Sequence, residues 1–246
     1  MIESIKNQVF KALHLGRGYP LMVRGRRYRF DESLRRFKTD GEEIIQEVLE
    51  TRLAEGGFFV DIGANFGLHT LLGCDLVGPT GKVLAVEPVP ANLALLRRNL
   101  QLNNYSTRTR VMEVALTADK SDSVEMTVED GLSPAASLSL GIGGKKISVP
   151  TSNLDTILID YEKTPDLIKI DVEGAEHEVL KGAINTLRKG PPLLIEVHRF
   201  SLGSFSSSSE NLSAFLAEYG YQEQRLSELK SIQGQYHHSL FTVQQP

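Results

Sequence analysis

The stretch that decides the fold is FFVDIGANFGLHTLL, residues 58–72. An apolar run of strand length, Phe58 to Ile62, leads directly into the loop Gly63-Ala64-Asn65-Phe66-Gly67, and leucines at helical spacing follow. A buried strand, a tight glycine-bearing turn and a helix in this order form the cofactor loop of a doubly wound sheet. The glycines let a ligand approach the backbone, and the helix N-terminus presents free N–H groups to an anion.

The ligand follows from how this loop differs from the G-x-G-x-x-G loop of nicotinamide-binding enzymes. Asn65 replaces the middle glycine, and Asp61 closes the strand with a carboxylate that would repel phosphates and attract an ammonium. The amino-acid end of S-adenosylmethionine suits this combination. The next apolar strand, Lys82 to Val86, ends in Glu87, where an acidic residue can accept hydrogen bonds from both ribose hydroxyls.

Four longer segments then resemble a known family. They are VDIGANFG, VLAVEPVPANLALLRRNLQLNN, LIKIDVEGAEHEVLKGA and PLLIEVH, and together they resemble the FkbM family of S-adenosylmethionine-dependent methyltransferases over residues 40 to 200. The most specific part is Lys169 to Glu176. The resemblance implies the Rossmann-like fold of class I methyltransferases, an α/β, doubly wound and mostly parallel sheet. It also implies O-methylation of a hydroxyl on a sugar, a polyketide or a related small metabolite.

Charge divides the chain into two predicted regions. Residues 1–38 hold ten Lys or Arg against three acidic residues, whereas the whole chain has a net charge of −4. We expect a basic N-terminal extension over 1–38, consisting of a short helix and a hairpin, and a methyltransferase domain over 39–246. Packing of the extension on its own domain or on a second copy explains it better than nucleic-acid binding, because aromatic residues are sparse among the arginines. The sequence therefore leaves open whether the protein forms a homo-oligomer.

Composition agrees with one soluble enzyme domain. The chain has 246 residues, 41% of them hydrophobic, and a single cysteine, Cys74, which we expect to be buried. One cysteine excludes an intramolecular disulfide and fits a reducing compartment. No run of about 18 apolar residues is present. We therefore expect a cytoplasmic protein without an integral membrane segment.

Helices and strands alternate along the remainder. A capping box at Thr39 and Glu42 predicts a helix to Leu53, and Pro90 precedes a helix over Ala91 to Leu102. Further helices are expected over 175–187 and 210–219, and strands over 108–115, 123–128, 146–149, 167–171, 193–197, 221–225 and 239–243. The Gly/Ser-rich stretch 131–144 is long for a loop and is interpreted as a lid over the substrate. The serine run 206–209 is interpreted as a second wall of the pocket.

Ligands of such sheets bind at the carboxyl ends of the strands. The candidate cofactor-binding residues lie there or in the adjoining loops: Asp61, Gly63, Ala64, Asn65, Gly67, Glu87, Pro88, Asn92, Glu113, Ala115 and Asp171. Methyl transfer depends on positioning, but a hydroxyl acceptor must also lose its proton. That proton requires a base or a metal ion close by.

His198 is the first candidate base, because imidazole titrates near neutral pH. Asp171 and Glu196 are the other catalytic candidates. The alternative is a divalent site in which Asp171, Glu173, Glu196 and His198 hold Mg²⁺ or Mn²⁺. The sequence leaves base and metal open. His69 and His177 are interpreted as packing or surface residues, and His237 and His238, which precede a predicted edge strand, indicate no function by themselves.

Two other functions remain for comparison. A nicotinamide-dependent oxidoreductase would use the same fold, but Asn65 and the incomplete glycine pattern disfavour it. A cofactor-binding module that has lost catalysis could serve as a partner or sensor. The intact loop, the ribose carboxylate Glu87 and the D-V-E-G segment argue against such decay, although loss of the acceptor pocket would leave all three unchanged.

Overall fold

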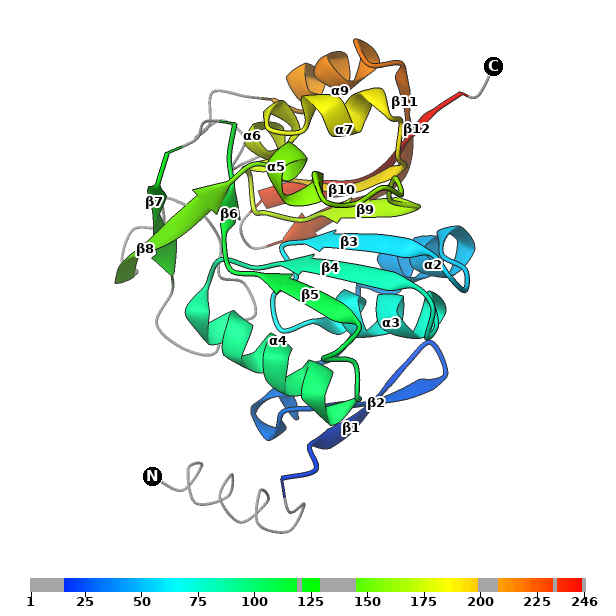
Figure 1. Cartoon of the computed structure of the whole chain (residues 1–246), viewed down its shortest axis with the longest axis vertical. Coiled ribbons are helices and arrows are strands. Elements are labelled where there is room, and N and C mark those ends of the chain that lie inside the picture. Colours follow the sequence, from blue (N-terminus) through cyan, green and yellow to red (C-terminus); the bar gives the residue numbers. More distant parts are fainter. Residues whose placement is uncertain (1–15, 119–120, 129–144, 199–207, 232–233, 245–246) are drawn as a thin grey trace.

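The fold is built on a seven-stranded sheet in the order β11-β12-β10-β9-β3-β4-β5 (Figure 1). The computed structural model describes residues 16–118, 121–128, 145–198, 208–231 and 234–244. The central strands are β3 (Phe58–Ile62), β4 (Lys82–Val86), β5 (Thr109–Met112), β9 (Leu167–Ile170) and β10 (Leu193–His198), which run parallel. At one edge, β11 (Tyr221–Ser231) and β12 (Gly234–Val243) form a hairpin, and β12 is antiparallel to β10.

Alternation along the strands divides the core between two faces of the sheet. Phe58, Val60 and Ile62 belong to one hydrophobic cluster, whereas Phe59 belongs to another. The first cluster is covered by α5 (Leu154–Leu158), α6 (Glu176–Lys181), α7 (Ile184–Arg188) and α9 (Ser209–Ala217), and the second by α2 (Glu43–Arg52), α3 (Leu68–Leu76) and α4 (Pro90–Leu102) (Figure 1). Because both faces are covered by helices, the strands are buried, as expected for a parallel sheet.

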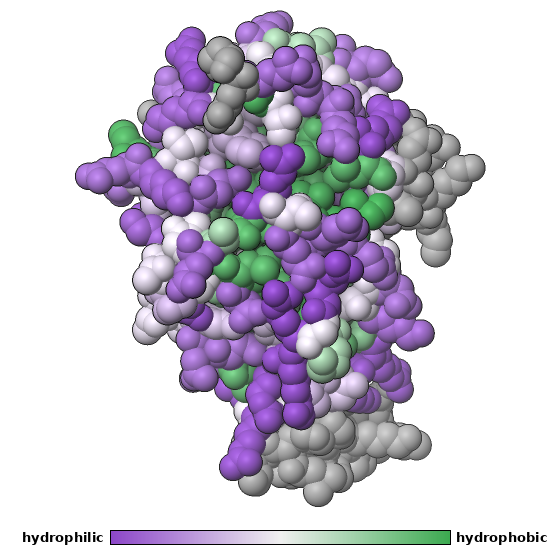
Figure 2. Space-filling view, turned by 90° about the vertical axis from the view of Figure 1, so that its right-hand side faces the viewer, coloured by the Kyte–Doolittle hydropathy of each residue, from purple (hydrophilic) through white to green (hydrophobic). Residues whose placement is uncertain are grey.

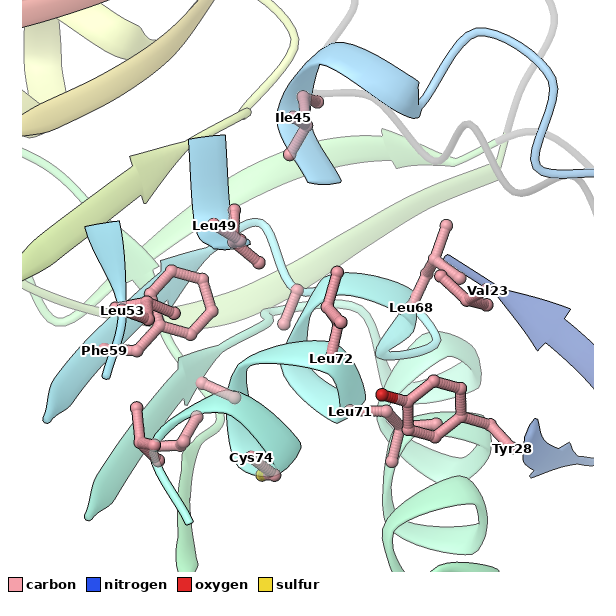
Figure 3. Packing of buried hydrophobic residues seen from close by; sticks show 14 of the residues in the cluster. Val23, Tyr28, Ile45, Leu49, Leu53, Phe59, Leu68, Leu71, Leu72 and Cys74 are labelled. Carbon is pink, nitrogen blue, oxygen red and sulfur yellow. The ribbon is translucent and has the colours of Figure 1, made fainter. Parts of the chain in front are cut away.

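The N-terminal hairpin extends the second cluster. It consists of β1 (Tyr19–Val23) and β2 (Arg26–Phe30), followed by the short 3₁₀ helix η1 (Glu32–Leu34). Figure 3 shows Tyr28 of the hairpin beside Leu71 of α3, with Leu49 of α2 and its C-cap residue Leu53 near Phe59. The hairpin thus shares a core with the sheet, while the domain boundary at residue 38 stays a prediction.

A small second sheet stands at one end of the large one, on the left in Figure 1. It has the order β6-β8-β7, with β6 at Ala115–Leu116, β7 at Ser123–Val128 and β8 at Lys145–Ser152. The strands β7 and β8 pair antiparallel, so the predicted lid segment connects them. The lid at 131–144, the first two residues of the serine run, 206 and 207, and residues 1–15 of the N-terminal extension lie outside the described residues.

Several predicted boundaries are wrong. Glu42, not Thr39, is the N-cap of α2, and Thr39 instead accepts a backbone hydrogen bond from Glu42 across a turn. The helix expected over 175–187 is divided into α6 and α7 at Gly182, which caps α6. The strand expected over 108–115 is divided into β5 and β6. Tertiary hydrogen bonds also make the C-terminal hairpin longer than the alternation predicted.

The surface is mainly polar. Within the described ranges, the exposed large hydrophobic side chains are Met22 and Ile159. Figure 2 shows one face, mostly hydrophilic, with a hydrophobic area near its centre. No helix in the described part of the chain is long and apolar enough to cross a bilayer.

Candidate functional site

The loop after β3 adopts the conformation that its glycines predict. Gly63, Asn65 and Gly67 all have positive φ, at 75°, 52° and 92°. A Cβ at Gly63 would lie 1.7 Å from the carbonyl oxygen of Asp171, so this position requires glycine. The amides of Gly63 and Ala64 both donate to the carbonyl of Val86, which ties the loop to the end of β4.

A first cavity opens beside this loop, at the carboxyl ends of β3 and β4. It contains seven of the predicted cofactor residues, Gly63, Asn65, Glu87, Pro88, Asn92, Ala115 and Asp171. The rest of its lining consists of Glu173, which the sequence singled out only as a possible metal ligand, and of apolar residues that it did not single out as site residues: Ile62, Val86, Val114, Leu116, Met126 and Val172. Met126 comes from β7 of the small sheet, so local sequence signals could not place it here.

Glu87 is the most strongly held polar group of this cavity. Its Oε2 accepts from the amide of Asn65 at 2.8 Å, and its Oε1 accepts from the amide of Val89 at 2.9 Å and from Asn92 at 3.2 Å. Burial raises the pKa of the Glu87 carboxyl to about 7, although these hydrogen bonds oppose the shift. The carboxylate is therefore fixed in place and titrates near neutral pH.

Asp61, a predicted cofactor residue, contacts other protein side chains. It is fully buried, and the residues described along the cavity wall do not include it. Its Oδ2 accepts from Thr70 at 2.6 Å, and its Oδ1 lies 3.5 Å from Nζ of Lys169, its partner in register on β9. Burial opposes the charge on Lys169, but Asp171 and Asp61 raise the pKa of its ammonium. Asp61 thus neutralises a buried lysine beneath the loop.

Three other predicted cofactor residues also lie elsewhere. Glu113 is about half exposed and pairs with Arg97 at the surface. Gly67 is the N-cap of α3, with no room for a Cβ against Leu96. Ala64 lines a second cavity rather than the first. Glu113 was misplaced because the chain turns between β5 and β6, which the predicted continuous strand concealed.

The second cavity adjoins the first. The two share Gly63, Asn65, Asp171 and Glu173, so they meet where β3 and β9 end. Its remaining wall is Phe37, Glu42, Ala64, Phe66, Leu68, His69, Lys169 and Glu196. The sequence reading missed Phe37 and Glu42 as site residues, and took His69 for a packing or surface residue. They reach the cavity through the packing of α2 and α3.

His198 lies behind this second cavity, within a group of carboxylates. Its Nδ1 is 2.8 Å from Oε1 of Glu176, and its Nε2 is 3.2 Å from Oε1 of Glu196 and 3.4 Å from Oε2 of Glu173. His238, opposite Glu196 on β12, approaches the other oxygen of Glu196 at 3.0 Å. His198 is nearly fully buried and does not belong to the described lining of either cavity.

The burial and close approach of these side chains shift their pKa values. Burial opposes the charged imidazole, yet hydrogen bonds with Glu176 and Glu196 raise the pKa of His198 well above its ordinary value. Burial likewise opposes ionisation of Glu196, but hydrogen bonds from His198 and His238 lower its pKa. Burial raises the pKa of Asp171, and that of Glu173 to about 7. This shift favours the charged imidazole, which argues against His198 as the base, although its role stays a prediction.

The seven-strand order, the antiparallel β12 and the glycine loop after β3 define the class I methyltransferase fold. A family model described as the methyltransferase FkbM domain matches residues 61–223, more than half of the chain. The chain therefore belongs to the FkbM methyltransferase family, which confirms the resemblance seen in the sequence.

Individual relatives agree with this assignment. Methyltransferase sdnD of Sordaria araneosa is 31% identical over 182 residues, covering 59% of this chain and 70% of the relative. Hexuronic acid methyltransferase AglP of Haloferax volcanii is 28% identical over 166 residues, covering 64% and 63%. The structure of M. jannaschii TYW2 in complex with AdoMet has a TM-score of 0.52 at 13% identity, covering 91% of this chain and 84% of that one, and shows the fold alone.

Proposed function

We propose that this protein transfers a methyl group from S-adenosylmethionine to a hydroxyl of a small metabolite. The observation that carries the proposal is the junction of two cavities at the ends of β3 and β9. The first cavity has mostly apolar walls and three carboxylates, of which Glu87 is fixed by three hydrogen bonds. The other is polar and open to a second molecule. A transferase needs two such compartments that meet at one point.

The first cavity fits the cofactor. Glu87 would accept the two ribose hydroxyls, since its oxygens are already oriented by three hydrogen bonds. The apolar side chains of Leu116, Val114 and Met126 would enclose the adenine ring. The loop from Gly63 to Asn65 would hold the amino-acid end, in place of Asp61. When bound, S-adenosylmethionine supplies the methyl group and a sulfur that leaves neutral with the electrons of the broken bond.

The second cavity fits an acceptor with several hydroxyls. Phe37 and Phe66 meet edge to face with ring centroids 4.7 Å apart, which gives an aromatic wall. Glu42 and His69 offer polar contacts on the same side. The relative named for hexuronic acid supports a carbohydrate-like acceptor. Asp171 lies at the junction of the two cavities and would take the hydroxyl proton. Glu196 and His198 would hold the side chains around Asp171 in place.

Calorimetry tests the cofactor. We expect S-adenosylmethionine and S-adenosylhomocysteine to bind in the micromolar range and NAD not to bind. Glu87→Ala should weaken binding by about 1–3 kcal/mol, because its hydrogen-bonding partners are left unpaired. Glu113→Ala is the matched control, since that carboxylate is at the surface, and should bind as the wild type does. Binding of NAD without S-adenosylmethionine would overturn the proposal.

A mass increase of one methyl in a screened pool of hydroxylated metabolites tests the transfer itself. Replacing Asp171 by Asn should lower turnover by about 10²–10⁴-fold at nearly unchanged cofactor affinity. Cofactor binding without transfer to any acceptor would favour the module that has lost catalysis.

A further inference from the structure

Three side chains at the edge of the second cavity, Asp171, Glu196 and His198, come from the same face of two neighbouring strands. Leu167 of β9 and Leu194 of β10 belong to the cluster under α2 and α3. Because side chains alternate along a strand, Asp171, Glu196 and His198 follow on that same face. The pairing of Ile170 with Ile195 brings the end of β9 beside Glu196.

We propose that Asp171, Glu196 and His198 bind one divalent metal ion at the edge of the acceptor cavity, with Mn²⁺ as the best-fitting ion. The geometry of this metal site does not depend on the proposed function. Only the use of the ion, which is to assist methyl transfer, rests on that function. One ligand atom from each of the three residues lies within 4.8 Å of the others. Two carboxylates and an imidazole suit Mn²⁺, since oxygen ligands favour hard ions and imidazole favours transition metals.

The separations match a shared ion. Nε2 of His198 lies 3.2 Å from Glu196 and 3.4 Å from Glu173. Neighbouring ligands of an octahedral ion with bonds of about 2.1 Å lie about 3.0 Å apart. Glu173 therefore stands where it can serve as a fourth ligand or as the proton acceptor once Asp171 is engaged by the ion.

Glu176 is an independent observation outside the ligand set. Its side chain is fully buried, and its Oε1 lies 2.8 Å from Nδ1 of His198. The same oxygen accepts from the amide of Gly174 at 2.9 Å, which fixes its position. A carboxylate that accepts from Nδ1–H orients the imidazole so that Nε2 points toward Glu196 and Glu173, and this kind of pairing orients most histidine ligands of metals. Glu176 is thus a positioning residue.

The position also suits an ion that assists the transfer. Asp171 and Glu196 line the acceptor cavity, and their side chains are 27% and 15% exposed. An ion between them would keep open positions facing the cavity. A hydroxyl oxygen of the acceptor could fill one of these and become more acidic.

Manganese binding tests the site without any activity. The full chain, treated with a chelator and desalted, is titrated with Mn²⁺ alone by calorimetry and electron paramagnetic resonance. We expect about one ion per chain and a nitrogen coupling from imidazole in the pulsed spectrum. His198→Gln and Glu196→Gln should weaken binding at least about 100-fold, and Glu176→Gln about 10–100-fold.

Glu42→Gln is the matched control, because Glu42 lines the same cavity outside the ligand set, and it should bind Mn²⁺ within about twofold of the wild type. Thermal unfolding shows which variants are folded. Absence of stoichiometric binding by the wild type, or binding without nitrogen coupling, overturns the site even if every variant misfolds. Affinity for S-adenosylhomocysteine, measured separately, tests the proposed function, so the two can fail independently.

Discussion

Asp61 and Lys169 face each other across neighbouring strands, both almost fully buried. A charge placed in the interior is tolerated only with a partner, and Thr70 supplies Asp61 with a further hydrogen bond. Lys169 also reaches Asp171 at 3.2 Å, so one ammonium joins the base of the loop to the candidate site. This pair therefore holds the ends of β3 and β9 in register.

Replacing Lys169 by Met should be strongly destabilising. It leaves the buried Asp61 without its countercharge, and we expect the free energy of unfolding to fall by about 3–5 kcal/mol in urea denaturation. Lys163→Met is the control, because Lys163 pairs with Asp166 at the surface and should cost no more than about 1 kcal/mol. Equal losses in the two variants would contradict the structural role of Lys169.

Glu87 gives a pH-dependent prediction. Its raised pKa means that the folded protein binds a proton more tightly than the unfolded chain does between pH 4.5 and about 7, so its contribution to stability falls as pH rises through that window. Cofactor binding has the opposite sign, because the ionised carboxylate accepts the ribose hydroxyls. Affinity for S-adenosylhomocysteine should rise up to about tenfold per unit as pH approaches 7 from below, then level off.

Glu87→Gln is the control for that experiment, since it cannot titrate. Calorimetry from pH 5.5 to 8.5 should show weaker binding by this variant at high pH, without the slope of the wild type. A parallel pH dependence in both proteins would assign the titration to another group or to the ligand.

At the scale of elements, the N-terminal hairpin contributes more buried side chains to the core than its basic sequence suggests. Arginines alternate with Tyr28 and Phe30, which are buried, and Arg26 pairs with Glu50 of α2 and Asp75 of α3. The local positive charge is thus partly neutralised by the protein's own acidic helices. This agrees with the expectation that the extension packs on its domain.

Truncating Tyr28 tests the hairpin. Its ring is 3% exposed, and its hydroxyl lies 3.3 Å from Asp75. Tyr28→Ala should lower the free energy of unfolding by about 3–5 kcal/mol, measured by chemical denaturation, because it leaves a cavity in the core. Met22→Ala, in the same hairpin but 56% exposed, should change it by less than about 0.5 kcal/mol. Similar values for both would show that the hairpin does not contribute to the core.

At the scale of the whole molecule, the candidate site joins several parts of the chain that are far apart in the sequence. The loop after β3, the ends of β9 and β10, Glu42 with Phe37, and Met126 of the small sheet all meet around the two cavities. Parallel strands make this possible, because their carboxyl ends converge at one edge while helices cover both faces. The first cavity draws on the small sheet and the second on the N-terminal elements, so cofactor and acceptor would be enclosed by different additions to one core.

The sequence by itself determined the strand, loop and helix from Phe58 to Leu72 and the family. Positive φ at Gly63, Asn65 and Gly67, apolar strands and the Pro90 helix start all depend on residues close together in the chain. Glu87 was placed for the same reason, since it directly follows its strand.

Only the tertiary structure decided which side chains face the cavities. Asp61 does not line the first cavity, because side chains alternate along a strand and its carboxylate pairs with Lys169 on the neighbouring strand. Glu176, on a helix 22 positions earlier, and Glu196 lie against the two ring nitrogens of His198, so its predicted role as base depends on contacts that the sequence did not indicate. Such roles depend on the charges and burial that distant strands and helices supply, and no local pattern in the sequence encodes them.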